Sequence, residues 1–295
     1  MATLRDIKAS ITSVNSTRQI TRTMEMVATA KIKKAQERIE SARPYALAMM
    51  EVLENVARFV RGASHPLLEV HPERRRIVAI AITSDRGMCG AFNSNILRLT
   101  EEIIGRETEA GVEVALISVG KKAVSYFRYR GVEPMATYRD ISDKPTFADA
   151  RSIAAHVIAA YTGGEIDGVE IVFNRFKSVA EQRPEIHELL PVAKAVVATG
   201  DSEIDRATPE YIFEPDAHRV LERLLPTYVE TLIYRALMES AASEQGARRT
   251  AMKSATDNAN EMVTTLTRSY NRARQAAITN EIAEIVGGAA TLEDA

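Results

Sequence analysis

Basic side chains gather in two stretches of the chain that contain neither Asp nor Glu, residues 7–24 and 262–280. Their basic residues are Lys8, Arg18, Arg22, Arg268, Arg272 and Arg274. A guanidinium group donates two parallel hydrogen bonds to a carboxylate, so arginines without acidic neighbours are suited to bind an acidic partner. The formal charge of the whole chain is only −2, so these stretches predict a local docking surface and argue against general coating of nucleic acid. An ordinary solvated face is the competing interpretation.

The sequence TSDRGMCGAFN at 83–93 follows an apolar, β-branched run, at the place where an open α/β sheet usually binds its ligand. Gly87 and Gly90 lack the spacing of a dinucleotide fingerprint, and the chain contains no P-loop sequence. We therefore interpret these glycines as serving a tight turn rather than a nucleotide. Cys89 could act as a nucleophile, but no sequence neighbour offers an evident base, which favours a small buried side chain.

The other residues with catalytic or ligating chemistry are scattered. Five histidines, at positions 65, 71, 156, 187 and 218, lack metal-ligand spacing and are interpreted as surface or capping residues. The acids are spread along amphipathic faces, with no isolated pair for general acid and base work. A lone cysteine cannot form an intramolecular disulfide, which suits a reducing cytoplasm. The sequence thus predicts no catalytic residue, no metal and no cofactor.

The N-terminal part of the chain has the apolar period of a coiled-coil helix. From Ile32 to Val60 apolar residues recur at alternating steps of three and four. The same stepping starts at Leu4, and the polar stretch NSTRQITRT at 15–23 interrupts it. Pro44 lies inside this pattern and is expected to kink or break the helix, because proline removes a backbone donor.

The C-terminal part shows a similar pattern, and Asp216 is the expected N-cap of its helix. Its apolar residues also step by three and four, with one extra step of four between Leu266 and Tyr270, which predicts a local change of supercoil. They are Met252, Ala255, Ala259, Met262, Leu266, Tyr270, Ala273 and Ala277.

We expect the two terminal helices to pair antiparallel and to project as a rod from a compact middle. The acid-free stretches would then lie at the same height and form a basic collar. Met26 is interpreted as core filler of this pair. Met24 is either core filler or an exposed residue that faces a partner.

Strand and helix patterns alternate in the middle of the chain, which predicts a doubly wound, mostly parallel, Rossmann-like sheet. A return strand after Arg183 is expected to pair antiparallel with the strand before it. The expected strands are 77–83, 112–119, 133–138 and 168–176, and the expected helices are 93–109, 121–130 and 147–161. The predicted organisation is an N-terminal coiled-coil helix at 1–62, a central α/β domain at 75–210 and a C-terminal coiled-coil helix at 214–288.

No apolar run approaches the roughly 20 residues that a membrane-spanning helix needs. The N terminus, MATLRDIKAS, has no hydrophobic core of a signal sequence. We therefore expect no membrane insertion by the chain itself.

Three motifs together resemble the gamma subunit of F-type ATP synthases. They are ITRTMEMVATAKIKKAQ near the N terminus, SDRGMCGAFN in the loop after the first strand, and NRARQAAITNEIAEIVGGAA near the C terminus. The similarity extends nearly end to end and includes SEQGARRTAMKSATDNA at 243–259.

The resemblance implies which residues bind partners. Arg274 and Gln275 match the family's contact to an acidic loop of the beta subunit, and Met24 matches a position that faces another acidic beta loop. Thr279 and Glu281 are expected on the other helix at a level similar to that of Met24. The YIFEPD segment, with Tyr211, Glu214 and Asp216, matches the foot near the c-ring and the epsilon subunit. Arg18, Arg22, Arg268 and Arg272 would join the beta-facing surface.

The resemblance also implies the function of a central rotor that turns inside a hexamer of alpha and beta subunits and performs no bond chemistry itself. Its partners would be the alpha, beta and epsilon subunits and the c-ring, without nucleic acid, and it would associate with the membrane only through the complex. Its expected location is the cytoplasmic face of a bacterial plasma membrane. A free coiled-coil tether and an α/β enzyme with helical arms are the alternatives. A tether would not need basic stretches, and an enzyme would need a phosphate-binding or nucleophile motif.

Overall fold

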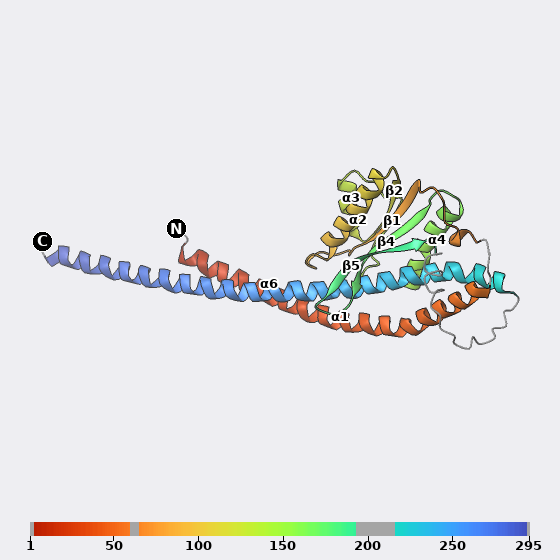
Figure 1. Ribbon diagram of the computed structural model, residues 1–295. Coiled ribbons are helices and arrows are strands. Elements are labelled where there is room, and N and C mark those ends of the chain that lie inside the picture. Colours follow the sequence, from red (N-terminus) through yellow and green to blue (C-terminus); the bar gives the residue numbers. More distant parts are fainter. Residues whose placement is uncertain (1–2, 60–64, 193–215, 294–295) are drawn as a thin grey trace. The chain divides into compact units, whose positions relative to one another are not determined.

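The computed structural model describes residues 3–59, 65–192 and 216–293 (Figure 1). Its contacts form two compact units: residues 1–28 with 249–295, and residues 29–248. The first unit is a pair of helices, and the second holds the sheet. The boundary between them crosses both terminal helices, α1 (Leu4–Phe59) and α6 (Ala217–Glu293).

The sheet of the second unit has the strand order β3-β2-β1-β4-β5. The first four strands are parallel, and β5 pairs antiparallel with β4. The strands are β1 (Arg76–Ile82), β2 (Glu113–Val119), β3 (Ala136–Tyr138), β4 (Gly168–Phe176) and β5 (Gln182–Leu190). The mostly parallel sheet and the antiparallel return strand predicted from the sequence are confirmed.

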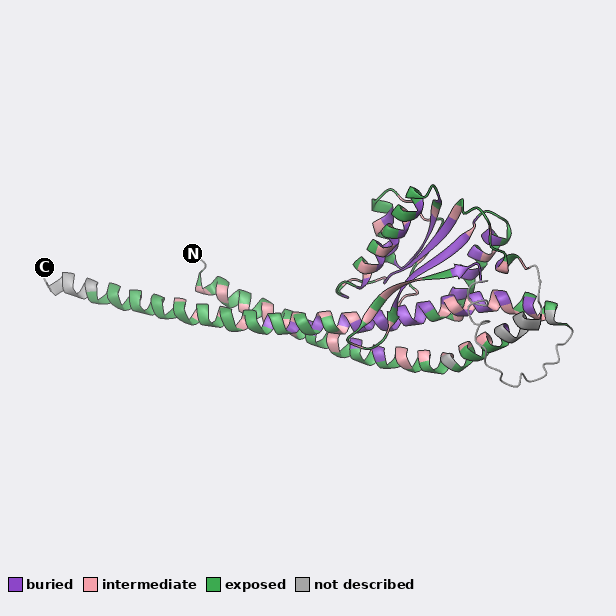
Figure 2. Cartoon of the chain, in the orientation of Figure 1, coloured by how far each residue is buried: buried purple, intermediate pink, exposed green. Residues whose placement is uncertain are grey.

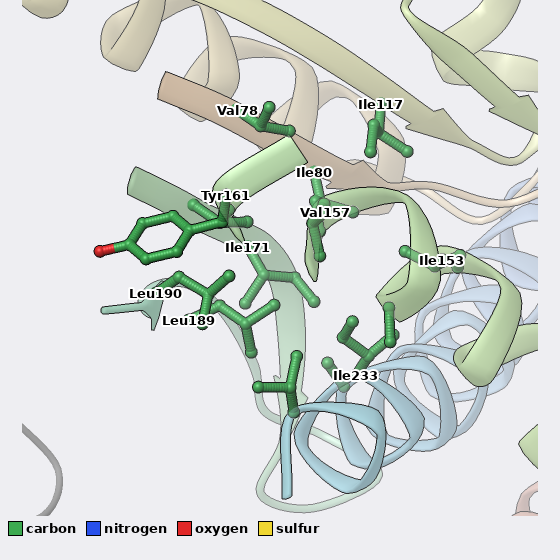
Figure 3. Close-up of a cluster of buried hydrophobic side chains, with 14 of the residues drawn as sticks. Val78, Ile80, Ile117, Ile153, Val157, Tyr161, Ile171, Leu189, Leu190 and Ile233 are labelled. Carbon is green, nitrogen blue, oxygen red and sulfur yellow. The ribbon is translucent and has the colours of Figure 1, made fainter. Parts of the chain in front are cut away.

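Helices cover both faces of the sheet, because alternate residues of each strand point to opposite sides. On one face Ile77, Ala79 and Ala81 pack with residues of α2 (Phe92–Glu109) and α3 (Lys121–Tyr129). On the other face Val78 and Ile80 pack with residues of α4 (Phe147–Thr162) and the first part of α6. Figure 3 shows this second cluster, with Val157 from α4 and Ile233 from α6. Strands buried on both faces explain the continuous apolar run of β1.

Capping side chains set the starts of the long helices. Thr3 and Asp6 cap α1 reciprocally: Thr3 N donates to Asp6 Oδ2 at 3.0 Å, and Asp6 N donates to Thr3 Oγ1 at 3.3 Å. Hydrogen bonds from the Thr3 side chain and backbone lower the pKa of Asp6. Asp216 accepts the N–H of Arg219 at 2.9 Å, so the predicted N-cap of α6 is confirmed. Pro44 lies within α1 without ending it, so the expected break is absent.

Burial confirms the predicted apolar line in the part of α1 that belongs to the second unit. Ile32 and Leu53 are buried, and the positions that step between them are partly buried (Figure 2). Lys31 from α1 and Gln245 from α6 both donate to the carboxylate of Asp143, at 2.7 and 3.3 Å. These contacts attach both helices to the segment before α4.

Candidate partner-binding surface

The helix pair of the first unit has an unbroken contact line. In α6 the least exposed positions step by four and three without a break: Met252, Thr256, Ala259, Val263, Leu266, Tyr270 and Ala273. The predicted extra step is therefore wrong. Val263 faces the partner helix, whereas Met262 is 54% exposed. In α1 the polar stretch does not interrupt the line, because Arg18 and Thr21 occupy contact positions.

Two polar contacts define the register of this pair. Thr21 Oγ1 and Thr256 Oγ1 are 2.8 Å apart in a buried layer, and Arg18 Nη1 donates to Asn260 Oδ1 at 3.2 Å. Because the helices are antiparallel, each residue forward in α6 is matched by one residue backward in α1. Arg268 is therefore level with Ala9.

In this register the two acid-free stretches overlap only in part, because residues 262–270 are level with residues 7–15. The expected collar at one height is therefore confirmed for Lys8 and Arg268 and wrong for the other arginines. Arg272 is level with Arg5, so the levels of Arg22 and Arg272 differ by about 17 residues, or about 25 Å at 1.5 Å per residue. The arginines follow the rod lengthwise. We call the following set the basic segment: Arg18, Arg22, Arg268, Arg272 and Arg274.

The basic segment is accessible. Arg18 is partly buried by its contact with α6, and the other four arginines are exposed. Within the described ranges, none of those four forms an ion pair with an acidic residue of the chain. Their guanidinium groups are thus available to carboxylates of another molecule.

Beyond Ala273, α6 continues as a single helix, because α1 begins at Leu4 (Figure 1). We call residues 274–293 the apical segment. Every side chain from Arg274 to Val286 is exposed (Figure 2). Gln275, Thr279 and Glu281 belong to this segment. The expectation that Thr279 and Glu281 lie at the level of Met24 is therefore wrong, since Met24 is level with Lys253.

The apical segment also exposes an apolar stripe that the sequence reasoning missed. Ile278, Ile282 and Ile285 are 48%, 56% and 66% exposed. Steps of four and three place them on one face of the helix. The signal was present in the sequence, since the stripe repeats the period of the contact line where α1 offers no partner.

Met24 and Met26 of α1 differ in their exposure to solvent. Met24 is partly buried. Met26 is 57% exposed, so its interpretation as core filler is wrong, and Ile20 and Val27 are 59% and 57% exposed. Exposed apolar side chains beside Arg22 form the mixed apolar and basic surface that is typical of a protein interface.

The predicted foot is described only in part. Tyr211 and Glu214 lie outside the described residues. Asp216 caps α6 and lies 3.8 Å from the guanidinium of Arg219. These local contacts give Asp216 a structural role at the start of the helix. Its contact with a partner stays a prediction.

The loop after β1 faces the place where parallel sheets bind ligands, and side chains of α6 occupy that place. Arg248 Nη2 donates to Gly87 O at 3.2 Å, and its Nη1 lies 2.7 Å from Glu244. Ser243 donates to the carbonyl of Asn174 on β4 at 3.0 Å. Burial raises the pKa of Glu244. Buried polar side chains of α6 therefore pack against this end of the sheet.

Two further residues of this loop are structural. Cys89 is 2% exposed, and burial raises the pKa of its thiol, which disfavours the reactive thiolate. Its interpretation as a small buried side chain is confirmed. Asp85 accepts backbone N–H groups of Lys121, Asp140 and Ser142 at 3.0 to 3.1 Å. Burial opposes ionisation of Asp85, but these hydrogen bonds prevail and lower its pKa.

The described ranges contain neither a cluster of metal ligands nor a helix that could span a membrane. No group of three or more His, Cys, Asp or Glu side chains there is placed to hold a metal ion. The described helices also include none that is long and apolar enough to cross a membrane. Of the histidines, His65 caps the short helix η1 (Pro66–Leu68) through a hydrogen bond from Leu67 N to its Nδ1 at 3.1 Å.

Comparisons with known proteins match nearly the whole chain to one family. A family sequence model described as ATP synthase matches residues 3–292. The ATP synthase gamma chain of Desulforamulus reducens is 50% identical over 293 residues, 99% of this chain and 100% of that relative. The gamma chain of Heliobacterium modesticaldum is 47% identical over 295 residues, again 99% and 100% of the two chains.

Solved structures share the fold. A chain from the central stalk and c-ring structure of the Tetrahymena thermophila mitochondrial ATP synthase has a TM-score of 0.61 and 27% identity, over 80% of this chain and 99% of that chain. A chain from the rotor of the Euglena gracilis mitochondrial ATP synthase has a TM-score of 0.66 at 21% identity, over 93% and 98%. The chain belongs to the ATP synthase gamma chain family.

Proposed function

We propose that the chain is the central rotor shaft of a bacterial ATP synthase and has no catalytic site of its own. The observation that carries the proposal is the helix pair with its basic and apical segments, which leave arginines and an apolar stripe exposed. The gamma chains among its relatives and the central-stalk structures that share its fold support this function. The packing of Glu244 and Arg248 against the loop after β1 supports the non-catalytic role.

The basic and apical segments would meet the catalytic hexamer of alpha and beta subunits. Arg274 and Gln275 would bind an acidic loop of one beta subunit, and Met24, Arg18 and Arg22 would face another acidic loop. Arg268 and Arg272 extend the basic surface between these levels, while Thr279 and Glu281 lie nearer the tip. A shaft transmits torque only if it binds the three beta conformations with different free energies, because only a differential interaction shifts a population.

The second unit would connect to the membrane part of the complex. We infer that the segment of Tyr211, Glu214 and Asp216 contacts the c-ring and the epsilon subunit. The chain would reach the cytoplasmic face of the plasma membrane only through these partners. The bacterial origin of the gamma chains to which it is similar supports this location.

Single-molecule rotation tests the proposal directly. Tyr129 is 88% exposed on α3, so Tyr129→Cys offers a site for a bead, while the buried native Cys89 should label slowly. The labelled chain is assembled with alpha and beta subunits, the hexamer is fixed to a surface, and ATP is added. We expect continuous rotation in one direction. An active assembly with a static bead would instead favour a tether, and hydrolysis by the chain alone would favour an enzyme.

A further inference from the structure

The second unit contains a cavity of about 540 Å³ between α1, α6 and the start of α4. Most of its lining is apolar, with Ile39, Ala46, Leu47 and Met50 from α1 and Met238 from α6. Cavities of 300 to 1,000 Å³ with apolar walls and a few convergent polar groups are typical of small-molecule sites. The basic and apical segments contribute nothing to this cavity, so the proposed rotor function does not account for it.

Three aromatic rings from three helices line the same cavity. They belong to Tyr45 of α1, Phe147 of α4 and Tyr234 of α6. Phe147 and Tyr234 meet edge to face, with centroids 5.6 Å apart. Tyr45 is 55% exposed although it lies on the cavity wall. Aromatic faces carry negative charge density and attract organic cations.

The polar part of the wall consists of Thr231 and the ion pair of Arg235 with Glu239, whose carboxylate is incompletely satisfied. The Glu239 side chain is only 8% exposed, and its Oε1 accepts a hydrogen bond from Arg235 Nε at 2.8 Å. Its Oε2 is buried without a hydrogen-bond partner, and it is the one carboxylate oxygen in this condition among the described residues. A buried acceptor without a donor destabilises the folded protein, because it has lost its hydrogen bond to water. The Arg235 side chain is 47% exposed and can turn toward solvent.

We propose that this cavity binds a small apolar molecule that carries a protonated amine. The ammonium group donates to the Glu239 carboxylate, and the apolar body lies between the aromatic rings and the α1 side chains. A carboxylate or phosphate ligand is disfavoured, because Arg235 already donates to Glu239 and the ligand would meet the Glu239 carboxylate at short range. A neutral hydrocarbon fills the volume but leaves Oε2 without a donor.

Dansylcadaverine is a suitable probe, because it joins an aromatic ring to a primary amine and its fluorescence reports an apolar environment. N-acetyl dansylcadaverine has the same body without the charge. With the purified full chain we expect saturable binding of one dansylcadaverine, and at least tenfold weaker binding of the acetylated form. Equal binding of the two probes, or no saturable binding, would overturn the proposal.

Variants locate the site. Glu239→Gln should weaken dansylcadaverine about tenfold and leave the acetylated probe nearly unchanged. Glu37→Gln removes an equal charge from an exposed position of α1 and should change neither probe. Ala46→Phe fills the cavity and should abolish binding of both. Circular dichroism checks that each variant is folded. If Glu239→Gln does not fold, the comparison of the two probes and the Ala46→Phe variant still test the proposal. Binding of dansylcadaverine that survives Ala46→Phe would show that the probe does not bind in this cavity.

Discussion

Arginine is the residue on which the proposed binding of partners by the helix pair depends. The exposed arginines of the basic segment have no carboxylate partner within the described part of the chain, whereas several arginines around the sheet do, such as Arg106 with Glu107 at 2.9 Å. A side chain that is left without a partner on a folded surface keeps its donors for another molecule. This contrast separates the arginines that we propose for docking from those that stabilise the fold.

Arg274→Ala should impair coupling in the assembled enzyme. The variant loses a charge-assisted contact to a beta subunit, which is worth about 2 kcal/mol, so ATP-driven proton pumping should fall more than ATP hydrolysis. Both rates are measured in membrane vesicles. Arg98→Ala serves as the control, because its side chain is 73% exposed on α2. Equal ratios of pumping to hydrolysis in the two variants would contradict the role of Arg274.

Asp85→Asn should destabilise the second unit by about 2 kcal/mol at neutral pH, because the carboxylate accepts three backbone N–H groups. The folded pKa of Asp85 is lowered. Its stabilising contribution is therefore present above the unfolded pKa of about 3.9 and is lost as pH falls through the folded pKa. Denaturant unfolding between pH 7 and pH 3 should show the difference between wild type and variant shrinking below about pH 4. A constant difference would contradict this account.

At the scale of the element, the pair formed by α1 and α6 contains a polar layer in its contact line. Most coiled-coil lines are apolar, but the pair around Thr21 and Thr256 is a buried polar layer. Thr256 also lies 2.9 Å from the carbonyl of Met252, and Thr21 lies 3.0 Å from that of Arg18. Each hydroxyl therefore also has a partner on its own helix, so the contact between them aligns the helices but is not needed to satisfy either hydroxyl.

Replacing both hydroxyls with methyl groups should therefore strengthen the pair. Thr21→Val combined with Thr256→Val adds apolar surface to a buried layer and should raise the free energy of local opening by about 1 kcal/mol. Hydrogen exchange of the α1 amides around this layer measures the change. Thr264→Val, at an exposed position of α6, should leave exchange unchanged. Faster exchange in the double variant would show that the polar layer stabilises the pair.

The apical segment should depend on its isoleucines more than on its last residues. Gly287 and Gly288 each cost a helix about 1 kcal/mol relative to alanine, so removal of residues 287–295 should leave coupled pumping nearly intact. Ile278→Ser with Ile282→Ser removes most of the exposed stripe and should reduce it. Similar pumping by the truncated chain and the double serine variant would argue against a docking role for the stripe.

At the scale of the whole molecule, the fold resembles that of nucleotide-binding proteins without the corresponding site. The sheet order is that of a Rossmann-like domain, but the loop after β1 lacks the dinucleotide-binding glycine pattern. Arg248 and Glu244 of α6 lie against that loop, and a second sheet-facing contact comes from Ser243. Side chains of α6 thus pack against the end of the sheet at which nucleotide-binding proteins hold their ligand.

The isolated chain should consequently bind no ATP. Calorimetric titration of the purified chain with ATP and Mg²⁺ should give only heats of dilution, whereas the assembly with alpha and beta subunits should bind nucleotide. Stoichiometric binding by the isolated chain would overturn the non-catalytic assignment. An assembly that binds nucleotide only when this chain is present would point to an indirect, conformational role.

Local patterns in the sequence were sufficient to predict the sheet and the helices. The run at 77–83, the return strand after Arg183 and the cap at Asp216 were all confirmed, because strand and helix periods and caps depend on neighbours in the chain. The basic stretches and the burial of Cys89 were also recognised from composition and context. Residues distant in sequence did not have to be placed for any of these predictions.

Tertiary structure decided how the two terminal helices align. A step of one residue turns a helix by 100°, so the sequence did not distinguish Met262 from Val263 as the contact residue. The level of Arg22 relative to Arg272 depends on the pairing of Thr21 with Thr256, which joins residues 235 positions apart. The packing of α6 against the loop after β1 likewise joins segments distant in the sequence. The register of the two helices and the packing of α6 against the end of the sheet both depend on contacts between whole elements. The local period of the sequence contains no information about such contacts.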